Sequence, residues 1–379
     1  MEHLVVVLPS VPVAGGKVQL ADKTLTGLRG FVDRWPGQVT AVGPAADADI
    51  AGNLGLQWYA PDALGLDVLH GNTVELVSHL KPDVLHLSLA VRERPLLDLG
   101  VPTVMFAENP ALERLRYALP GSRLVNRPRM MAGAVRQELV QRDMVKRASA
   151  LACNGWNAWR WYGRPARRVH EHEPILVFDS RLPLHRVEQA RERIDDASDR
   201  AAPLRLGFSG RLHPAKGPNH AVAASRELDA RGVRHTLTIF GTGPMEAELR
   251  RQAGPSVQFA GEVAFDPVWM DRVADEVDLM VLPHTQGDPS GTYLESAGMG
   301  VPILGFRNAA LNGFAREAKF AWVTDERSGT ALADVAERLS RDRPEIRRAA
   351  LAGVTFAQEH AFEKAFDARV RQLVRVAEG

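Results

Sequence analysis

Two cations, Arg211 and Lys216, stand five residues apart directly after the apolar run 204–209. Arginine offers a planar pair of donors to phosphate oxygens, and lysine offers a compact positive charge. The run has the composition of a buried strand, and in open α/β sheets ligands bind beyond the carboxyl ends of the strands. The pair could therefore hold a diphosphate without a metal ion. A solvated basic loop is the alternative interpretation.

A second candidate phosphate site lies between Gly287 and Pro302. Ser290, Gly291 and Thr292 form a small-residue turn that opens a predicted helix. The first amides of a helix have no partners within it, so they can bind phosphate oxygens. Glu295 follows in the first turn or two of this helix, where its carboxylate could bind a pair of ribose hydroxyls. Its alternative role is to complement the helix dipole.

Two glycine patterns match nucleotide-binding loops only in part. Residues 241–246 stand between a strand and a helix, but Glu246 occupies the third glycine position of the dinucleotide fingerprint, and its carboxylate takes the place of a pyrophosphate. The sequence around Gly15 and Gly16 lacks the first glycine and the Ser or Thr of a Walker loop. This second pattern is either a plain tight turn or a loop that cradles phosphate or substrate.

Two acidic or histidine-rich patterns could suggest a metal site. Asp47-Ala48-Asp49 has the spacing of a metal-binding Asp-x-Asp motif, but it falls in a polar stretch rather than after a buried strand. His170-Glu171-His172 has no third and fourth ligand at suitable spacing. We expect both to be structural, and we expect no metal.

The elements that must position these residues alternate between short apolar runs and helical stretches, which favours parallel sheets covered on both faces. The predicted strands are residues 3–8, 37–42, 83–87, 102–106, 148–153, 204–209, 236–240, 257–260, 278–282 and 301–306. The predicted helices are residues 18–35, 219–231, 245–252, 266–275, 293–299 and 361–377, together with a short one for which Asn154 would be the N-cap.

The fold class expected is α/β, with two doubly wound, Rossmann-like domains facing a central cleft. An N-terminal domain is expected over residues 1–186. A charged linker follows over 187–203, and a second domain over 204–360. The last segment, 361–379, is predicted as a helix with its apolar residues near one face.

Length and composition limit the functional class. The chain has 379 residues, which suggests two domains, and its net charge is only +1, which argues against a wholesale nucleic-acid binder. A single cysteine rules out an internal disulfide and suits a reducing compartment. No apolar run approaches the ~20 residues of a membrane-spanning helix, and the first run is too short for a signal peptide. A cytoplasmic protein is expected.

The small net charge conceals a basic stretch over residues 123–168, where eleven basic residues face two acidic ones. This stretch also contains Trp156, Trp159, Trp161 and Tyr162. It could attach the protein peripherally to an anionic membrane on its inner face, with rings at the interface. The alternatives are that the rings pack in the N-terminal core, or that the cations bind an anionic soluble acceptor.

The ordered motifs of residues 204–306 resemble the donor domain of the retaining GT-B glycosyltransferases of family four, the group 1 type. The order is a strand with Gly-Arg-Leu-x-Pro-x-Lys-Gly, a strand with Gly-x-Gly-Pro, Val257-x-Phe-x-Gly, Asp278 with its Leu-Pro strand, and the Glu295 helix with Gly-Val-Pro. The first half resembles the family more loosely, through the double glycine and the segments 81–86 and 100–102. The last helix resembles one that crosses back to the N-terminal domain.

This resemblance implies a role for each matching residue. Arg211 and Lys216 would neutralise the leaving diphosphate, the amides of 290–292 would bind phosphates, and Glu295 would bind the ribose. Backbone at Val263 would meet the base. The double glycine, Gly15 and Gly16, would lie against the distal phosphate or the sugar.

Two positions depart from the family's pattern. A glutamate often stands eight residues before Glu295 and touches the donor sugar, but here Gly287 occupies that position and Asp288 lies beside it. A histidine commonly follows the strand after Gly-x-Pro, and here the position offers Glu108. Asp288 and Glu108 are therefore included as candidate catalytic residues, with a structural role as the alternative for Glu108.

The function expected is transfer of a sugar from a UDP- or GDP-sugar to an acceptor hydroxyl, with retention and without a metal or other cofactor. The resemblance implies that the domain over 1–186 would bind the acceptor and the domain over 204–360 the nucleotide sugar. The acceptor would be a glycan, a lipid-linked glycan or a small molecule. The alternatives are a nucleotide-sugar epimerase of the same architecture and a catalytically silent nucleotide-sugar-binding homologue.

Overall fold

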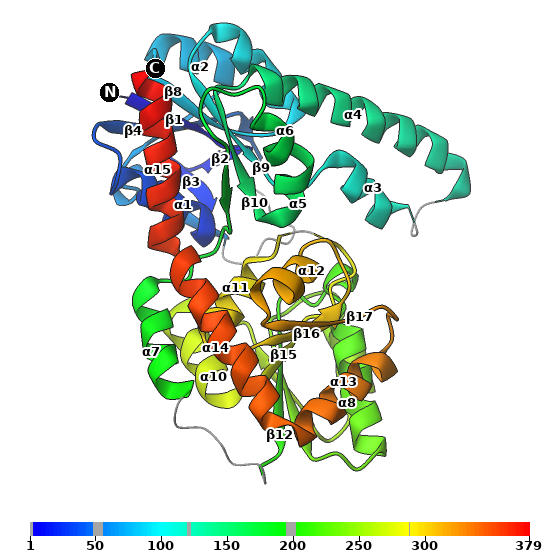
Figure 1. Ribbon diagram of the computed structural model, residues 1–379. Coiled ribbons are helices and arrows are strands. Elements are labelled where there is room, and N and C mark those ends of the chain that lie inside the picture. The colour runs from blue at the N-terminus through cyan, green and yellow to red at the C-terminus, as the bar shows by residue number, and fades with distance from the viewer. Residues whose placement is uncertain (1–2, 48–55, 120–122, 195–201, 288) are drawn as a thin grey trace. The chain divides into compact units, whose positions relative to one another are not determined.

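The computed structural model describes residues 3–47, 56–119, 123–194, 202–287 and 289–379. The chain divides into two compact units (Figure 1). Unit 1 is Met1–Asp179 together with Glu363–Gly379, and unit 2 is Ser180–Phe362. Among the described residues, no helix combines the length and the apolar character needed to cross a bilayer.

Unit 1 is built on a seven-stranded sheet in which all neighbouring strands are parallel. In spatial order its strands are β11 (Ile175–Val177), β10 (Ala150–Asn154), β9 (Thr103–Ala107), β8 (Val84–Ser88), β1 (His3–Val7), β4 (Gln38–Gly43) and β7 (Asp67–His70). A smaller four-stranded sheet has the order β5 (Ala45–Ala46), β2 (Val11–Ala14), β3 (Lys17–Ala21) and β6 (Leu56–Tyr59).

The helices of unit 1 cover this parallel sheet (Figure 1). They are α1 (Asp22–Val32), α2 (Thr73–Leu80), α3 (Ala111–Ala118), α4 (Arg127–Arg147), α5 (Gly155–Ala158), α6 (Arg164–Ala166) and α15 (Phe362–Glu378), with short helical segments η1 (Pro61–Ala63), η2 (Val91–Leu99), η3 (Leu124–Asn126) and η4 (Trp159–Gly163). The strand interiors are apolar on both faces, as a doubly covered parallel sheet requires. Val5, Leu85 and Met105, for example, are fully buried in one cluster.

Unit 2 has a six-stranded sheet, again parallel throughout. The spatial order is β14 (Val257–Gly261), β13 (His235–Phe240), β12 (Leu204–Ser209), β15 (Leu279–Val281), β16 (Ile303–Phe306) and β17 (Ala321–Thr324). Its helices are α7 (Leu184–Ile194), α8 (Pro218–Ala230), α9 (Glu246–Gln252), α10 (Met270–Glu276), α11 (Gly291–Gly298), α12 (Leu311–Gly313), α13 (Gly329–Arg341) and α14 (Arg343–His360), with η5 (Pro214–Lys216), η6 (Phe265–Trp269) and η7 (Phe314–Ala318).

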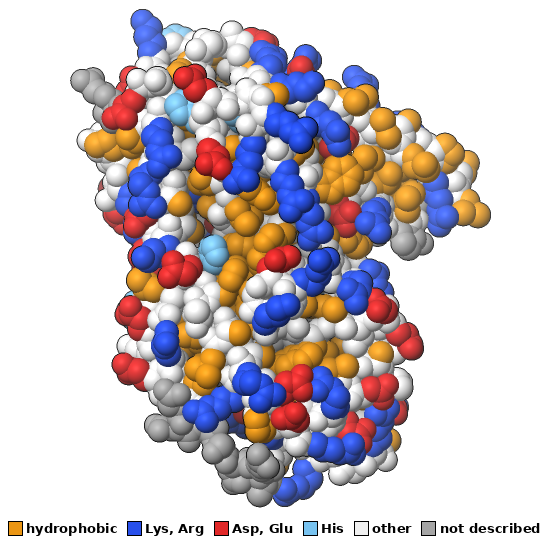
Figure 2. All heavy atoms as spheres, viewed as in Figure 1, with side chains coloured by type: hydrophobic (Ala, Val, Ile, Leu, Met, Phe, Trp, Pro, Cys, Tyr) orange, Lys and Arg blue, Asp and Glu red, His pale blue; other side chains and the backbone are white. Residues whose placement is uncertain are grey.

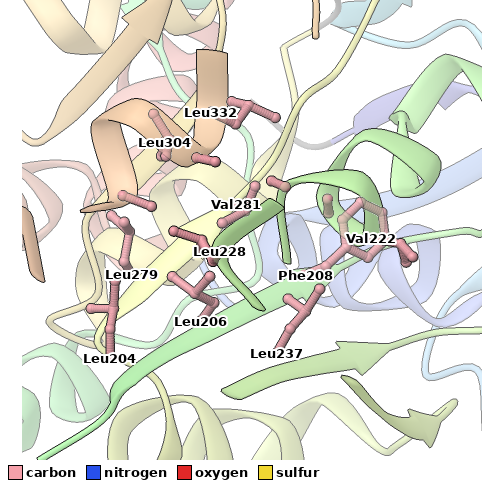
Figure 3. Packing of buried hydrophobic residues seen from close by; sticks show 14 of the residues in the cluster. Leu204, Leu206, Phe208, Val222, Leu228, Leu237, Leu279, Val281, Leu304 and Leu332 are labelled. Atoms are coloured by element: carbon pink, nitrogen blue, oxygen red, sulfur yellow. The ribbon is translucent and has the colours of Figure 1, made fainter. Parts of the chain in front are cut away.

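The core of unit 2 forms where helices α8 and α13 cover one face of this sheet. Leu206 and Phe208 of β12 lie with Leu279 of β15 against Leu228 of α8 and Leu332 of α13 (Figure 3). All five side chains are buried. This rigid core fixes the strand ends from which the loops of unit 2 emerge.

The first boundary between the units differs from the predicted one. The chain crosses between units at Asp179 and Ser180 instead of within 187–203. The last segment, from Glu363, belongs to unit 1, in agreement with the predicted helix over 361–379 that returns to the N-terminal domain. Residues 184–194, which overlap the predicted linker, form helix α7, with Val187 and Ala190 buried against unit 2. The many charged residues of this segment led to the linker prediction. A surface helix needs only a narrow apolar stripe on one face, so a mostly charged segment can still form one.

Most predicted strands are present within a residue or two, but the segment 18–35 is not one helix. Residues Lys17–Ala21 form strand β3, which pairs antiparallel with β2 and β6, and helix α1 begins only at Asp22. Tertiary pairing in the small sheet overrides the helical pattern there.

Candidate functional site

The polar residues of unit 2 gather where its strand order reverses. β12, β13 and β14 follow one another to one side, and β15, β16 and β17 to the other, so β12 and β15 are adjacent strands whose following loops diverge. This switch point is where open α/β sheets bind ligands, beyond the carboxyl ends of the strands. The loop after β12 carries Arg211 and Lys216, and the loop after β15 leads to Ser290 and helix α11.

These two loops are in direct contact. The backbone N–H of Thr285 donates to the Ala215 carbonyl at 3.1 Å. Gly217 has φ +68°, and a Cβ added there would lie 2.3 Å from the Pro283 carbonyl oxygen, so only glycine permits this approach. The contact holds Lys216 beside residues 283–285.

Arg211 lies on a loop whose backbone packs against the Gly241–Gly243 turn. The Leu212 N–H donates to the Thr242 carbonyl at 2.9 Å. A Cβ at Gly241 would lie 2.1 Å from the Gly210 carbonyl oxygen, and one at Gly243 would lie 2.6 Å from that of Leu212. These glycines therefore let one turn pack on the backbone of the other. No carboxylate among the described residues forms an ion pair with Arg211.

The remaining predicted residues of unit 2 lie along the same edge of the sheet. Ser290 precedes helix α11 without capping it through its side chain, and Gly291 and Thr292 form its first turn. Glu295 is buried at 8% exposure, and its Oε1 accepts from the Arg181 backbone N–H at 3.3 Å. Val263 is half-buried, directly after edge strand β14. Asp288 lies outside the described residues.

A buried polar network behind this edge was missed in the sequence. Asn308 accepts from the N–H groups of Ala310 and Leu311 at 3.1 and 2.9 Å, and its amide nitrogen donates to the Tyr293 hydroxyl at 3.2 Å. That hydroxyl lies 2.9 Å from Nδ1 of His284. Burial, together with the charge of Lys216, holds the pKa of His284 well below its usual range, so this imidazole is neutral.

The sheet edge of unit 1 presents a second set of polar residues. Glu108 is exposed just after β9, and Asn154 at the end of β10 donates to it at 3.3 Å. The Asn154 Oδ1 also accepts from the Asp179 N–H at 3.0 Å. Asn154 occupies the predicted N-cap position of α5, but its side chain makes no capping hydrogen bond there. It joins the loops after β9 and β11 instead.

A half-buried carboxylate with two cationic partners lies at the same edge. Lys23 Nζ lies 2.7 Å from Asp179 Oδ2, and Arg369 Nη1 lies 3.7 Å from Oδ1. Burial alone would raise the pKa of Asp179, but the charges of Lys23 and Arg369 outweigh it, and the pKa lies below its ordinary value. Asp179 is therefore ionised. It could have been suspected from the sequence, since it follows an apolar run at a strand's carboxyl end.

Gly15 and Gly16 do not form a strand-to-helix loop. They are the two central residues of the β2–β3 hairpin, where Ala14 pairs with Lys17. Their φ values of +55° and +73° suit the hairpin turn that requires positive φ at both positions. The tight-turn interpretation accounts for both glycines.

The aromatic residues of the basic stretch pack within unit 1. Tyr162 is 2% exposed, and Trp159 and Trp161 are partly buried against the same core. Arg167 lies over the Trp159 ring at 4.9 Å, and Arg142 over Trp161 at 5.8 Å. The rings therefore serve the core. The exposed apolar residues of this stretch lie elsewhere, on η3 and α4.

Of the two patterns considered for metals, only residues 170–172 lie wholly within the described part of the chain. Residues 170–172 form a bend before β11, with the His170 ring bonded to the Val145 carbonyl. Asp47 is described, but residues 48 and 49 lie outside the described part of the chain. Over residues 3–47, 56–119, 123–194, 202–287 and 289–379, no group of three or more His, Cys, Asp or Glu side chains is arranged to hold a metal ion.

Comparison with known proteins finds a family match for part of unit 2. Residues 203–342 match the family model of the group 1 glycosyl transferases. The putative colanic acid biosynthesis glycosyltransferase WcaL of Salmonella typhimurium is 28% identical over 151 residues, which are 37% of this chain and 36% of that protein. The amylovoran biosynthesis glycosyltransferase AmsK of Erwinia amylovora is 27% identical over 187 residues, 46% of this chain and 45% of that protein. The matched stretches thus span less than half the length of these relatives.

Solved structures show the fold. Anabaena HepE in complex with UDP superposes with a TM-score of 0.67 at 14% identity, covering 99% of this chain and 100% of that one. The same protein has been solved with UDP-glucose, with a TM-score of 0.63. The fold is GT-B, with two Rossmann-like units, and the resemblance to the group 1 glycosyltransferases is confirmed.

The close contact between Gly241 and the Gly210 carbonyl leads to a prediction about the stability of the protein. Gly241→Ala places a Cβ against the Gly210 carbonyl at a φ of +124°. We expect it to lower the free energy of unfolding by about 2 kcal/mol or more, measured by urea denaturation. The matched control is Gly133→Ala in helix α4, where a Cβ meets nothing within 4 Å. It should stabilise the protein by about 0.5–1 kcal/mol. Equal stability of the two variants would contradict the assigned contact.

Proposed function

We propose that this chain, whose residues 203–342 match the group 1 glycosyl transferases, transfers a sugar from a nucleoside-diphosphate sugar to an acceptor hydroxyl. The observation that carries the proposal is the meeting of two loops at the β12–β15 switch point. One loop brings Arg211 and Lys216, and the other brings the first amides of helix α11. Cations and free amides converging on one sheet edge are suited to a diphosphate.

The chemistry required of these groups is stabilisation of a leaving group. As the bond between the sugar's anomeric carbon and the diphosphate oxygen breaks, negative charge grows on the diphosphate. In this proposal, Arg211 and Lys216 neutralise that charge. Fixed donors of this kind often account for a large part of the lowering of the activation barrier. The acceptor oxygen forms the new bond to the anomeric carbon, and its proton leaves to a phosphate oxygen or solvent.

The finer features of the reaction rest on the resemblance. We propose retention of anomeric configuration, because the motifs that match come from retaining enzymes. We propose that no metal is needed, because two cations already serve the diphosphate. Since a neighbour of the same fold was solved with UDP and UDP-glucose, UDP-sugars are the first donors to test.

The acceptor is proposed to bind at the sheet edge of unit 1. Glu108 and Asn154 present a carboxylate and an amide there, which can bind hydroxyls. An exposed carboxylate can also accept a proton from an acceptor hydroxyl. A glycan, a lipid-linked glycan and a small molecule all offer such hydroxyls.

A membrane-facing surface on unit 1 would suit a lipid-linked acceptor. We define the α4 surface as the exposed apolar side chains of η3 and α4, which rise to 81% exposure at Val125 and 63% at Leu139. Its members are Leu124, Val125, Met131, Val135 and Leu139. Figure 2 shows hydrophobic side chains gathered over the projecting α3–α4 region, with Lys and Arg side chains nearby. Arg129 and Arg136 are exposed on the same helix.

Apolar and basic residues together favour an anionic lipid surface. Each basic residue near such a surface contributes ~1 kcal/mol, and the apolar side chains enter the headgroup boundary. Peripheral attachment to an inner membrane face is therefore proposed for the α4 surface rather than for the tryptophans.

Two other functions would use the same unit 2 site. A nucleotide-sugar epimerase needs no acceptor, so it would alter a UDP- or GDP-sugar in the absence of any acceptor. A silent homologue would bind the nucleotide and transfer nothing. Gly287, which stands where the family often has a glutamate, motivates the second alternative.

The first functional prediction concerns the diphosphate cations. Arg211→Ala and Lys216→Ala should each lower turnover of the preferred UDP- or GDP-sugar by about 10²-fold or more, because each removes a donor to the leaving group. Turnover is measured as nucleotide release with acceptor present. Arg251→Ala, on an exposed residue of α9, is the control and should leave turnover unchanged. Near-normal turnover of both cation variants would contradict their roles.

The second functional prediction concerns the α4 surface. The full chain should sediment with vesicles containing anionic phospholipid at low salt, and much less with neutral vesicles, which offer no charge to the basic residues. High salt should also weaken the binding, because counterions screen the basic residues. The double substitution Val135→Glu and Leu139→Glu should weaken this binding about tenfold or more, since each places a negative charge on the apolar side chains that would enter the headgroup boundary. Val169→Glu, at another exposed apolar residue of unit 1, is the control. Absence of vesicle binding at every salt concentration would remove the proposal.

A further inference from the structure

A cavity of about 290 Å³ lies within unit 1 at its own switch point. β1, β4 and β7 run to one side of the sheet and β8, β9, β10 and β11 to the other, so β1 and β8 are the diverging pair. The cavity is lined by the ends of both strands, including Leu8 and Ser88, and by Lys23 and Arg369 from helices α1 and α15. Its place in the fold is therefore that of a ligand site.

Arg369 is a buried cation with few partners. Its exposure is 8%, and its Nη2 donates to Nε2 of His86 at 3.1 Å. Its Nη1 is 3.7 Å from Asp179, which is longer than a hydrogen bond. Its buried Nε has no hydrogen-bond partner among the described residues. The rings of Phe31, Phe106 and Phe366 surround the guanidinium at 4.9, 4.6 and 4.6 Å.

The neighbours of Arg369 do not neutralise it fully. Burial and the charge of Arg369 hold the pKa of His86 well below its usual range, so His86 accepts a hydrogen bond without sharing charge. Asp179 is held more closely by Lys23, at 2.7 Å. The cavity lining thus contains two cations and one carboxylate. The charge of Glu108 also reaches Arg369, but Glu108 is exposed and does not line the cavity.

A buried charge with too few partners destabilises the folded state unless another group supplies the missing interactions. Burial accordingly lowers the pKa of Arg369 from its ordinary value, although Asp179 and Glu108 oppose the shift. An oxyanion placed in the cavity would pair with the two lining cations, Arg369 and Lys23, whose charges Asp179 alone does not balance. A guanidinium is suited to such a partner, because its donors match the geometry of carboxylate and phosphate.

We propose that this cavity binds a carboxylate or phosphate group of the acceptor, so that the acceptor is an acidic sugar or a sugar phosphate. The walls fit a sugar ring, since Thr24 and Ser88 offer hydroxyls and Leu28 and Phe106 offer apolar faces. Only the identification of this ligand as the acceptor rests on the proposed transfer reaction. Binding to the cavity can be measured without any donor.

A purely structural role for Arg369 would be to anchor α15 to the sheet of unit 1. That role explains the aromatic contacts and the bond to His86, but it does not require a cavity beside the side chain or an unpaired Nε. It also predicts no dependence on the charge of a ligand. A comparison of charged and neutral ligands therefore distinguishes the two roles.

The test measures binding of D-glucuronate, D-glucose 6-phosphate and D-glucose to the full chain by ligand-observed NMR. At least one of the two anions should bind about tenfold or more tightly than neutral glucose, because a charged hydrogen bond to Arg369 is gained. Which anion binds more tightly distinguishes a carboxylate from a phosphate. UDP binding to unit 2, measured on the same preparation, reports separately on the proposed donor site.

Three substitutions and one control test whether the anion binds in this cavity. Arg369→Met and Lys23→Met should each abolish the preference for an anion, because one cation of the lining is lost. Asp179→Asn should strengthen anion binding, because it removes the competing carboxylate at nearly constant size. Arg371→Met, on an exposed residue of the same helix, should change nothing.

The results that would overturn the proposal are equal binding of glucose and both anions, or a preference that survives in Lys23→Met. Lys23 is half exposed, so its variant remains informative if Arg369→Met does not fold. If UDP fails to bind while the anion preference holds, the proposed function fails and the cavity's ligand class stands.

Discussion

The reversal of strand order in each parallel sheet is the constraint on which both candidate sites depend. At β12–β15 in unit 2 and at β1–β8 in unit 1, the following loops turn to opposite faces and leave space beyond the strand ends. In unit 2 the space is bordered by loops that touch through Thr285 and Gly217. In unit 1 it is the cavity beneath α15. Each site therefore follows from topology before any side chain is considered.

The placement of the unit 2 candidate residues on the loops after β12 and β15 could be predicted because each residue is close in sequence to the strand that it follows. Each strand is followed within a few residues by its loop, so Arg211 and Lys216 are close in sequence to the strand that positions them. The turn at residues 290–292, the second candidate phosphate site, is predicted from its own small residues. His284 and Asn308 could not be found this way, because their importance arises from a hydrogen-bonded network that joins two different loops.

Unit 1 was predicted less completely because its polar site is assembled from distant segments. Lys23, Asp179 and Arg369 come from a helix start, a unit boundary and the returning last helix. No local pattern links residues this far apart, and Arg369 looks in the sequence like one more charge on an amphipathic helix. The small sheet was missed for a related reason. Its strands are short, and Gly15-Gly16 fits both a hairpin and a ligand-binding loop.

The two sites hold their cations in opposite ways, and this difference bears on how each would bind. Arg211 lies on a loop and is partly exposed, so an anion must displace water from it and hold its side chain in one position. Arg369 is already desolvated and fixed by three aromatic rings, so that cost is met when the protein folds. A preorganised cation discriminates strongly between ligands, because a ligand without a matching oxyanion leaves its buried donor unpaired. Unit 1 is accordingly the unit whose geometry is suited to selecting one acceptor, whereas the loops of unit 2 are suited to gripping a diphosphate that donors share.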